Sequence, residues 1–583
     1  MPNIKNQKTI QRFSHPGFNK QQRPFGMKGR GLDDKAYQEV VALLESEKYF
    51  LPKINIKNGD VPRRDLLIEY LHLIQDKYHC LQKKHIKALA VVMKLAETEI
   101  YEVASFYAHF DILPDGESPP KITVRVCDSV ACMMAGAHDV IKNLQKKHLP
   151  AVNIKPSPCM GHCDRSPVAE VGFSYVYGAT VEKICQKIKN QDIHVDKLKA
   201  PNLKSFQKSE LKGYGLLKKI RTEKKFGDEV IAILADANLR GLGGAGFPAA
   251  KKWQIVRGFQ AEKLMAVNID EGEPGTFKDY FYLAKNPHQF ILGMLMAAEI
   301  VGVSKIFIYL RDEYPDIRLL LQKTLQEAEG FFGNIAIELR RGAGAYICGE
   351  ESAMIESIEG KRGLPRNRPP FVAEVGIFNR PTLVNNMETL YWVPEIVMRG
   401  SDWWNGFGVN GRRGLRSFSL SGRVKKPGVK LAAAGITVKE LIENYGGGMM
   451  AGHRFKGYLP GGASGGILPA TMDSLPLDFD TLQEYGCFIG SAAVVVLSDK
   501  DNMADIAENL MKFFKDESCG QCTPCRVGTE KVLALIKQRK WHKDLLDELT
   551  VVMSDASICG LGQAAGNPIK SVMTHFPNDF TAM

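Results

Sequence analysis

The stretch AEKLMAVNIDEGEPG, residues 261–275, decides the fold of the central part of this chain. Its apolar run ends in an acidic turn, and the apolar helical pattern PHQFILGMLMAAEIVG follows at residues 287–302. The next apolar run, KIFIYLRDEYP at residues 305–315, predicts a second buried strand. Because strands and helices that alternate at this spacing form a mostly parallel sheet covered by helices, we expect an α/β domain here.

Glycine-rich and polar loops surround this strand pair. RGLGGAGFP (240–248) has glycines that allow backbone N–H groups to approach a phosphate closely. GAGAYICGEES (342–352) and VNNMET (384–389) are further loops rich in Gly, Asn or acids. Each loop taken alone is equally well explained as a solvated turn. Together they offer carboxylates to ribose hydroxyls or to flavin ring N–H groups, which a phosphate site alone does not need.

The 583 residues are too many for one core and predict several further units. Apolar residues recur at helical intervals before residue 110, and strand and helix patterns then alternate in a short α/β segment. A β-rich, Gly-rich segment follows the central domain, and the C-terminal part is helical. The expected divisions are a basic tail (1–32), a helical segment (33–110), a small α/β domain (111–190), a basic linker (191–225), the central domain (226–400), an α+β unit (401–485) and a helical domain (486–583).

One group of cysteines lies near the C-terminus. Cys519, Cys522 and Cys525 are three residues apart, and Cys559 is the only cysteine downstream of them. Three thiols at this spacing suit a cluster whose iron corners each need one thiolate, whereas zinc more often takes two separated pairs. We therefore expect these four residues to hold one [4Fe–4S] cluster. The alternatives are a zinc ribbon or four inert thiols.

A second group of cysteines lies in the small α/β domain. Two loops each offer a thiolate pair, Cys127 with Cys132 and Cys159 with Cys163, which matches a [2Fe–2S] cluster. Zinc accepts the same four ligands, so spacing leaves both open. A [4Fe–4S] cluster in the same polypeptide favours [2Fe–2S] over zinc at these four cysteines, because two clusters can pass electrons from one to the other. The remaining four of the twelve cysteines are scattered, which favours a reducing compartment and predicts a cytoplasmic protein.

The formal net charge of +12 is concentrated in two segments. Residues 1–30 hold seven Lys or Arg and no acid, and residues 197–225 hold ten against two acids, so the remainder is close to neutral. No groove-reading motif accompanies these runs, and we expect no nucleic-acid partner. No apolar run approaches the ~18 residues of a membrane helix, so we expect no direct membrane insertion. A transit peptide at the N-terminus is an alternative that scarce Ser and interrupting Pro and Gly make weaker.

Five motifs in consistent order resemble the NADH-binding flavoprotein subunit of respiratory complex I and its relatives, over about residues 225–583. They are RGLGGAGFP with KKW, NIDEGEPGTFKD, GAGAYICGEESAMIESIEGKRGLPRNRPPF, PTLVNNMETL, and SCGQCTPCR with ICGLGQ. CDSVAC with PCMGHC is similar to the small thioredoxin-like [2Fe–2S] subunit that pairs with it, over about residues 35–190. The resemblance implies N-terminal helices plus a thioredoxin-like α/β domain, a Rossmann-like FMN/NADH domain, a small β-grasp-like α+β domain and a C-terminal helical bundle.

The resemblance also implies FMN, NAD, a [4Fe–4S] and a [2Fe–2S] cluster as cofactors, and roles for individual residues. The residues expected around FMN are Gly241, Gly243, Gly244, Lys252, Asn268, Asp270, Glu271, Gly349, Glu350, Asn385, Asn386 and Thr389. The residues expected to face the nicotinamide dinucleotide are Phe247, Glu273, Tyr346, Glu351, Arg368 and Phe371. Lys is usual in the family where Arg368 stands, a change that keeps the charge and alters its geometry. No catalytic acid–base pair beyond these residues is expected.

Three systems of this family use such a module: complex I, NAD-linked hydrogenases and NAD-linked formate dehydrogenases. Fusion of the two parts in one polypeptide argues against the usual complex I arrangement. The sequences of several motifs are most similar to the formate dehydrogenase β subunit. The partner implied is a large molybdenum or tungsten bis-pterin α subunit with further Fe–S clusters, which oxidises formate. The alternatives are the diaphorase subunit of an NAD-reducing hydrogenase, a fused complex I flavoprotein, and an assembly factor that zinc stabilises and that carries no redox cofactor.

Overall fold

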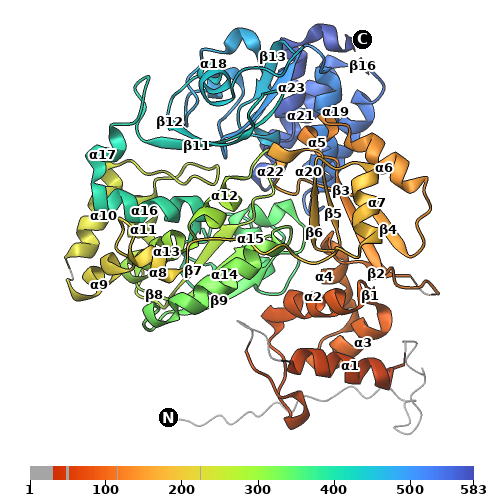
Figure 1. Ribbon diagram of the computed structural model, residues 1–583, viewed down its shortest axis with the longest axis vertical. Helices are drawn as coiled ribbons and strands as arrows, with labels where there is room; N and C mark the ends of the chain where they lie inside the picture. Colours follow the sequence, from red (N-terminus) through yellow and green to blue (C-terminus); the bar gives the residue numbers. More distant parts are fainter. Residues whose placement is uncertain (1–30, 47–51, 115, 224, 583) are drawn as a thin grey trace, which may run out of the picture.

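The computed structural model describes residues 31–46, 52–114, 116–223 and 225–582, so most of the expected basic tail lies outside the described residues. Figure 1 shows the N-terminal helices at one end of the molecule, with the small α/β domain beside the central domain and the C-terminal helices at the opposite end. The expected α/β multidomain architecture is confirmed, because the described residues form three sheets of four or five strands, and two of two strands, among many helices.

The central sheet has the strand order β10-β7-β8-β9, and all its strand pairs are parallel. Every residue of helix α13 except Glu299 is buried, which explains why its sequence is apolar on all sides. The predicted parallel sheet is therefore confirmed. Its elements are β7 (Lys263–Ile269), β8 (Val303–Leu310), β9 (Ala336–Arg341), β10 (Thr382–Asn386), α10 (Phe226–Asp236), α11 (Ala249–Arg257), α12 (Lys278–Lys285), α13 (Pro287–Val301), α14 (Pro315–Ala328), α15 (Glu351–Ile358) and α16 (Met387–Arg399).

The N-terminal helices dock on the central domain through buried ion pairs. Arg340 on β9 is 1% exposed and pairs with Asp65 and, at 3.4 Å, with Glu69. A buried arginine requires such partners, because an unpaired charge is costly away from water. The elements of this segment are α1 (Asp34–Glu45), α2 (Leu67–Tyr78), α3 (Lys83–Met93), α4 (Glu97–Phe106), β1 (Leu81–Gln82) and β2 (Ile112–Leu113).

The small α/β domain contains a mixed sheet of order β4-β3-β5-β6. Strand β3 runs parallel to β4 and antiparallel to β5, as expected for a thioredoxin-like sheet. Cys127, the first cysteine of the second group, is the last residue of β3. The elements are β3 (Ile122–Cys127), β4 (Val152–Ser157), β5 (Val168–Val171), β6 (Ser174–Tyr177), α5 (Val130–Met134), α6 (Ala137–Gln145) and α7 (Val181–Lys189).

The segment expected as a basic linker is folded onto the central domain. It forms α8 (Leu203–Gln207) and α9 (Gly215–Thr222), both of which contact α13. Phe206 and Leu217 are each 1% exposed, whereas the lysines of these helices stay at the surface. Burial of a few apolar side chains is thus enough to fix a segment whose charge suggests a solvated linker.

A mixed sheet of order β12-β11-β15-β13-β14 follows. Strand β15 lies beyond the expected division at residue 485, yet it pairs with both β11 and β13 and occupies the centre of this sheet. All six residues of β15 are buried, so its apolar run AVVVLS is the core of the α+β unit. The elements are β11 (Leu415–Gly422), β12 (Gly428–Ala433), β13 (Phe455–Leu459), β14 (Leu468–Pro469), β15 (Ala493–Ser498), α17 (Ser401–Asn405) and α18 (Val438–Glu440).

The C-terminal part is helical, as expected, and two short strands pair at its end. Its elements are α19 (Met503–Asp516), α20 (Thr523–Ile536), α21 (Lys543–Ala556), α22 (Gly560–Ala564), α23 (Asn567–His575), β16 (Lys540–Trp541) and β17 (Thr581–Ala582). Within the described ranges, no helix combines the length and apolar character needed to cross a membrane.

Candidate functional site

Polar side chains gather at the carboxyl ends of the two neighbouring strands β7 and β10. Asn268 Nδ2 donates to the Gly349 carbonyl at 2.9 Å, and Asn268 Oδ1 accepts from the Asp270 N–H at 2.9 Å. Asn386 Nδ2 donates to Asp279 Oδ2 at 2.7 Å. The edge beyond the carboxyl ends of parallel strands is where open α/β sheets bind ligands. Both asparagines therefore hold loops of a candidate binding site.

The glycine loop between α10 and α11 is held against this edge. Gly241 N–H donates to the Phe247 carbonyl at 2.8 Å, and the Leu242 N–H donates to Thr389 Oγ1 at 2.9 Å. A Cβ atom at Gly243 would lie 2.9 Å from the Asn386 Cβ, a distance that real side chains do not tolerate. Glycine is thus required at this position for the loop to reach Asn386.

The strand β10 presents its two asparagines to opposite sides, as successive strand residues do. Asn385 Oδ1 accepts from Trp253 Nε1 at 2.9 Å, which fixes α11 against the sheet. Lys252, the preceding residue of α11, donates to the Val384 carbonyl at 3.2 Å. Three further charged side chains are buried near β10: Lys278 pairs with Asp279 at 2.7 Å and with Glu388 at 3.0 Å.

Three acidic residues follow β7, and each has a different environment. Asp270 Oδ2 is buried without a hydrogen-bond partner among the described residues, and burial raises the pKa of this carboxyl well above its usual value. Glu271 accepts from the Asp279 and Tyr280 N–H groups, yet burial raises its pKa to about 8. Glu273 accepts from the Ser464 N–H at 2.7 Å. An orphaned polar atom such as Asp270 Oδ2 marks a place where a bound group can supply the missing partner.

The N-terminus of α15 carries a small network of charges. The Glu350 carboxylate accepts from the N–H groups of Ser352 and Ala353 and caps the helix. Arg368 pairs with Glu350 and lies 3.4 Å from the Glu351 carboxylate. Glu351 also faces Lys252, at 3.7 Å from carboxylate oxygen to Nζ. These contacts place four of the expected cofactor residues within one patch.

Two expected aromatic residues stand at the surface. Phe247 is 41% exposed and Phe371 is 56% exposed. Lys252 Nζ lies 5.9 Å from the centroid of the Phe247 ring, at the limit of a cation–π contact. Such exposed rings are available to stack on a planar ligand.

Tyr346 connects this region with the C-terminal helices. Its phenol donates to the Glu273 carboxylate, and its backbone N–H donates to Glu517 Oε2 at 2.8 Å. Burial raises the pKa of Glu517 to about 7. Since Glu517 closely precedes the cysteine loop, one tyrosine spans the distance from the sheet edge to that loop.

The four C-terminal cysteines converge at the start of two helices. Cys522 precedes α20, Cys525 lies in its first turn, and Cys559 precedes α22. A Cβ atom at Gly562 would lie 2.9 Å from the Cys525 Cβ, so the two helices meet closely at this point. Burial raises the pKa of the Cys559 thiol to about 12, and the Cys519 and Glu350 charges contribute to the shift. The four residues expected to hold the [4Fe–4S] cluster therefore stand at the starts of α20 and α22 and in the loop before α20.

The four cysteines of the second group, Cys127, Cys132, Cys159 and Cys163, are buried between β3, α5 and the loop after β4. The Cys159 and Cys163 sulfurs are 3.3 Å apart. Contacts with the Cys127 and Cys163 thiols, followed by the nearby Arg311 guanidinium, hold the pKa of Cys159 well below its usual range. Thiolate character is what metal ligation needs. In the part of the chain that the structure describes, no group of three or more His, Cys, Asp or Glu is spaced to hold a single metal ion.

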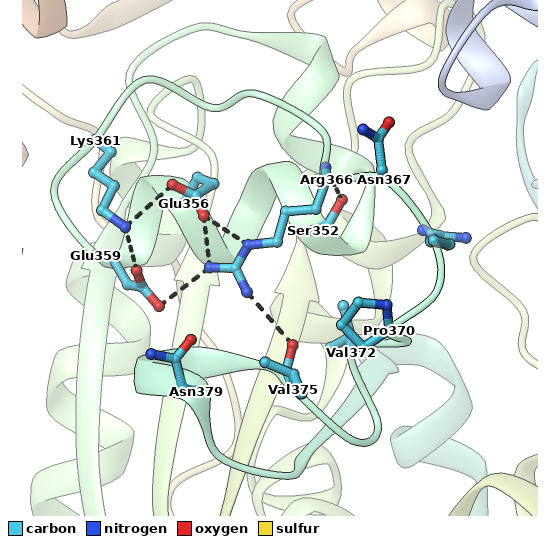
Figure 2. A pocket seen from close by; sticks show the side chains of 11 residues that line it. Ser352, Glu356, Glu359, Lys361, Arg366, Asn367, Pro370, Val372, Val375 and Asn379 are labelled. Atoms are coloured by element: carbon cyan, nitrogen blue, oxygen red, sulfur yellow. Dashed lines mark hydrogen bonds and ion pairs between the residues drawn. The ribbon is translucent and has the colours of Figure 1, made fainter.

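A cavity of about 270 Å³ lies beside α15, and Figure 2 shows the residues around it. Its charges are paired with one another: Arg366 reaches Glu356 at 2.6 Å and Glu359 at 3.3 Å, and Lys361 reaches Glu359 at 2.7 Å. Because these partners already satisfy one another, the cavity offers little to a charged ligand. Arg368 lines the cavity and links it to the charge patch at the start of α15.

Comparison with known families matches three parts of the chain. Residues 234–395 match the Nuo51 FMN-binding domain, residues 505–583 match the NADH-ubiquinone oxidoreductase-F iron-sulfur binding region, and residues 54–192 match the thioredoxin-like [2Fe-2S] ferredoxin. An NADH-quinone oxidoreductase subunit of Rhizobium meliloti (strain 1021) is 40% identical over 61% of this chain and 88% of its own length. The chain belongs to the family of this NADH-quinone oxidoreductase flavoprotein.

Other members of this flavoprotein family are hydrogenase subunits. The NADP-reducing hydrogenase subunit HndC of Solidesulfovibrio fructosivorans is 37% identical over 64% of this chain and 79% of its own length. A chain in the crystal structure of an NAD+-reducing [NiFe]-hydrogenase in the H2-reduced state aligns with a TM-score of 0.77 and 29% identity, over 89% of this chain and 92% of the other. That alignment extends over the fused N-terminal part as well.

As a member of the NADH-quinone oxidoreductase flavoprotein family, the chain is an oxidoreductase subunit with an FMN-binding domain, an NADH-binding function and two iron–sulfur regions. The predicted cofactors are therefore confirmed, and the zinc alternatives for the cysteines are not needed. Sequence reasoning missed several residues that shape the site. They are Trp253, Lys278, Asp279, Glu388, Ser464, Glu517 and Arg311. Trp253, Lys278, Asp279 and Glu388 stand inside the motifs KKW, NIDEGEPGTFKD and PTLVNNMETL, and Arg311 directly follows the apolar run of β8.

Proposed function

We propose that this chain exchanges hydride between NAD(H) and FMN and exchanges single electrons between FMN and its two clusters. When bound, FMN supplies this conversion, because a flavin accepts both hydride and single electrons. The observation that carries the proposal is the bridge made by Tyr346, whose phenol bonds Glu273 and whose N–H bonds Glu517. It supports a nucleotide site at the sheet edge that adjoins the cysteine loop.

The chain's own residues fit FMN at the edge of the central sheet. Gly243 keeps the glycine loop close to Asn386, where a phosphate would meet backbone N–H groups. Asp270 supplies a buried carboxyl oxygen without a partner among the described residues, suited to a polar group of the ring or of the ribityl chain. The residues proposed to hold FMN are Gly241, Gly243, Gly244, Lys252, Asn268, Asp270, Glu271, Gly349, Glu350, Asn385, Asn386 and Thr389.

The nicotinamide dinucleotide is proposed to lie on the exposed side of the same edge. Phe247 and Phe371 present exposed rings, and Arg368 with Glu351 presents charge at the N-terminus of α15. Glu273 and Tyr346 orient the end of the site that lies nearest the cysteine loop. The residues proposed to face NAD(H) are Phe247, Glu273, Tyr346, Glu351, Arg368 and Phe371.

The cysteine groups are proposed as the cluster ligands. Cys519, Cys522, Cys525 and Cys559 converge at two helix starts and would hold the [4Fe–4S] cluster. Cys127, Cys132, Cys159 and Cys163 are buried together and would hold the [2Fe–2S] cluster. Their soft sulfur donors suit iron–sulfur ligation. Reduced thiols of this kind also support a cytoplasmic location.

A separate formate-oxidising subunit, with a molybdenum or tungsten bis-pterin centre, is the partner we propose. This partner is supported by the similarity of motifs such as KIFIYLRDEYP to the formate dehydrogenase β subunit and by the fusion of the two parts in one chain. A hydrogenase partner is the second candidate, and it is favoured by the alignment that covers 89% of this chain with an NAD+-reducing [NiFe]-hydrogenase subunit. In either case the chain would pass electrons between NAD(H) and a metal centre held elsewhere.

The isolated chain tests the electron-transfer proposal. It should reduce a dye with NADH and be inert to formate and to hydrogen, because the proposed residues provide only for flavin, nucleotide and clusters. Iron and acid-labile sulfide analysis beside a flavin spectrum should find all three groups. A purified chain that holds zinc and neither flavin nor sulfide would support the assembly-factor alternative instead.

The native complex tests the partner. Affinity purification of the full-length chain from its own cells, followed by assays of NAD+ reduction with formate and with hydrogen, separates the two candidates. Formate-dependent reduction with molybdenum or tungsten in the preparation supports the first candidate. Hydrogen-dependent reduction without a response to formate would overturn it in favour of the second.

A further inference from the structure

Arg311 connects the loop of the second cysteine group with the loop of the flavin site. It lies directly after β8, and its side chain is 3% exposed. One guanidinium nitrogen, Nη2, donates to the Cys159 carbonyl at 2.5 Å, and Nη1 donates to the Glu271 carbonyl. Cys159 belongs to the small α/β domain and Glu271 to the central domain, so the Arg311 side chain bridges the two domains.

The charge of Arg311 is balanced by one nearby carboxylate. Glu313 lies 2.9 Å from Nη2 and 3.2 Å from Nε, and its own side chain is 9% exposed. The His109 ring lies 3.7 Å from the same carboxylate. The Arg311 guanidinium also stands over the Tyr314 ring, with 5.0 Å to its centroid. A buried cation this close to a ligand loop exerts a field that water screens only weakly.

The loop that Arg311 contacts is fixed tightly enough for that field to act at a constant distance. Gly161 has φ +72°, and a Cβ atom at this position would lie 2.1 Å from the Tyr314 hydroxyl. On the other side of the cysteine group, Asn509 Nδ2 of α19 donates to the Asp128 carbonyl at 2.8 Å. Both cysteine loops are therefore anchored to other domains.

We propose that Arg311 is a positioning residue that raises the reduction potential of the [2Fe–2S] cluster and holds the Cys159 loop against the flavin site. Reduction adds one electron to the cluster, and a nearby cation stabilises the added negative charge. Net charge and hydrogen bonds around the ligands are known determinants of cluster potentials. The inference depends on the proposed [2Fe–2S] ligands, and it assigns a role to a residue outside the ligand set.

The pair of charges gives variants with opposite expected effects. Arg311→Gln removes the cation and should lower the midpoint potential. Glu313→Gln removes the balancing anion and should raise it, and Arg311→Lys should keep it near the wild-type value. We expect Arg311→Gln to reduce the ratio of reduced to oxidised cluster about tenfold at a fixed potential, which equals about 59 mV for a one-electron couple. A mere loss of packing would not shift the midpoint potential in opposite directions in Arg311→Gln and Glu313→Gln.

The experiment is a redox titration of the full-length reconstituted protein, followed by electron paramagnetic resonance. The [4Fe–4S] signal of the same sample is the internal control and should not move. Arg399→Gln, which removes a surface pair with Glu210, is the matched arginine control. Should Arg311→Gln fail to fold, Glu313→Gln still decides, because its potential must rise. Unchanged potentials in the folded variants would overturn the inference, whereas absence of a [2Fe–2S] signal from the wild type would overturn the proposed ligand set.

Discussion

Asn268 at the end of β7 and Asn386 at the end of β10 are register partners in the central parallel sheet. Aligned residues on adjacent parallel strands face the same side, so the two amides reach the loops on one side of the sheet. Asn268 holds the Gly349 and Asp270 backbone, and Asn386 bonds Asp279 and lies behind Gly243. The register of one strand pair thus assembles the proposed flavin site from four separate parts of the sequence.

Replacing Asn268 by Ala should weaken FMN binding by about tenfold or more. The change removes the bonds to Gly349 and Asp270, each worth about 1 kcal/mol, and so releases two loops of the site. Titration of apoprotein with FMN measures the affinity. Asn367→Ala, at an exposed asparagine beside the cavity of Figure 2, is the control and should bind normally. Equal affinities in the two variants would contradict the proposed role of Asn268.

Replacing Cys522 by Ser should abolish the [4Fe–4S] signal and leave FMN bound. Cys522 stands at the start of α20, while the proposed flavin residues lie on the central sheet. NADH-dependent transfer to the partner should be lost with the cluster. Cys185→Ser, outside both cysteine groups, is the control and should keep both cluster signals. A complete four-iron spectrum in Cys522→Ser would show that another residue is the ligand.

Replacing Glu351 by Gln should raise the efficiency with NADP+ about tenfold or more and affect NAD+ less. A carboxylate repels a 2′-phosphate, and its removal leaves the positive charges of Lys252 and Arg368 beside the site with one less anion to balance them. Steady-state kinetics with both nucleotides measures the change. Glu356→Gln, on the cavity side of α15, should leave the preference unaltered. If the NADP+ to NAD+ ratio does not move in Glu351→Gln, this carboxylate does not face the 2′ position.

Replacing Gly161 by Ala should destabilise the protein more than replacing Gly136 by Ala. Both glycines have positive φ, which costs a residue with a Cβ roughly 1 kcal/mol. At Gly136 nothing lies within 4 Å of the new atom, whereas at Gly161 it overlaps the Tyr314 side chain. We expect a further loss of about 1–3 kcal/mol from that overlap. Urea unfolding measures the free energy of unfolding of the two variants. Equal losses of stability would show that the loop can move away from Tyr314 at no cost.

The stability of the apoprotein should fall as pH rises from about 4.5 to about 8. Burial raises the folded-state pKa of Glu271 to about 8, above the roughly 4.3 of an unfolded chain. Between these values the unfolded state loses a proton that the folded state keeps, so the free energy of unfolding declines with pH. Glu271→Gln should flatten this decline in thermal unfolding, and Glu374→Gln, at an exposed site, should not. An unaltered slope in Glu271→Gln would assign the effect to other groups.

The alternation of strands and helices predicted the parallel sheet, and the cysteine spacings predicted both ligand groups. These signals are local: the period of a helix or strand and the span of a turn are set by neighbouring residues. The basic segment before residue 225 was misleading, because charge on one face of α8 and α9 hides the few apolar residues on the other. The position of β15 in the mixed sheet was also not visible, since an apolar strand does not reveal its partners.

The sequence by itself marked candidate residues for FMN and iron–sulfur binding, because thiol spacing is visible over a few positions and the glycine-rich and acidic loops carry the family resemblance. Only the tertiary structure decided which of these sites touch. The contacts of Arg311 with Cys159 and of Tyr346 with Glu517 join residues 152 and 171 positions apart in the chain. Such contacts depend on how whole domains pack, and packing is a property of the summed buried surface that no short stretch of sequence encodes.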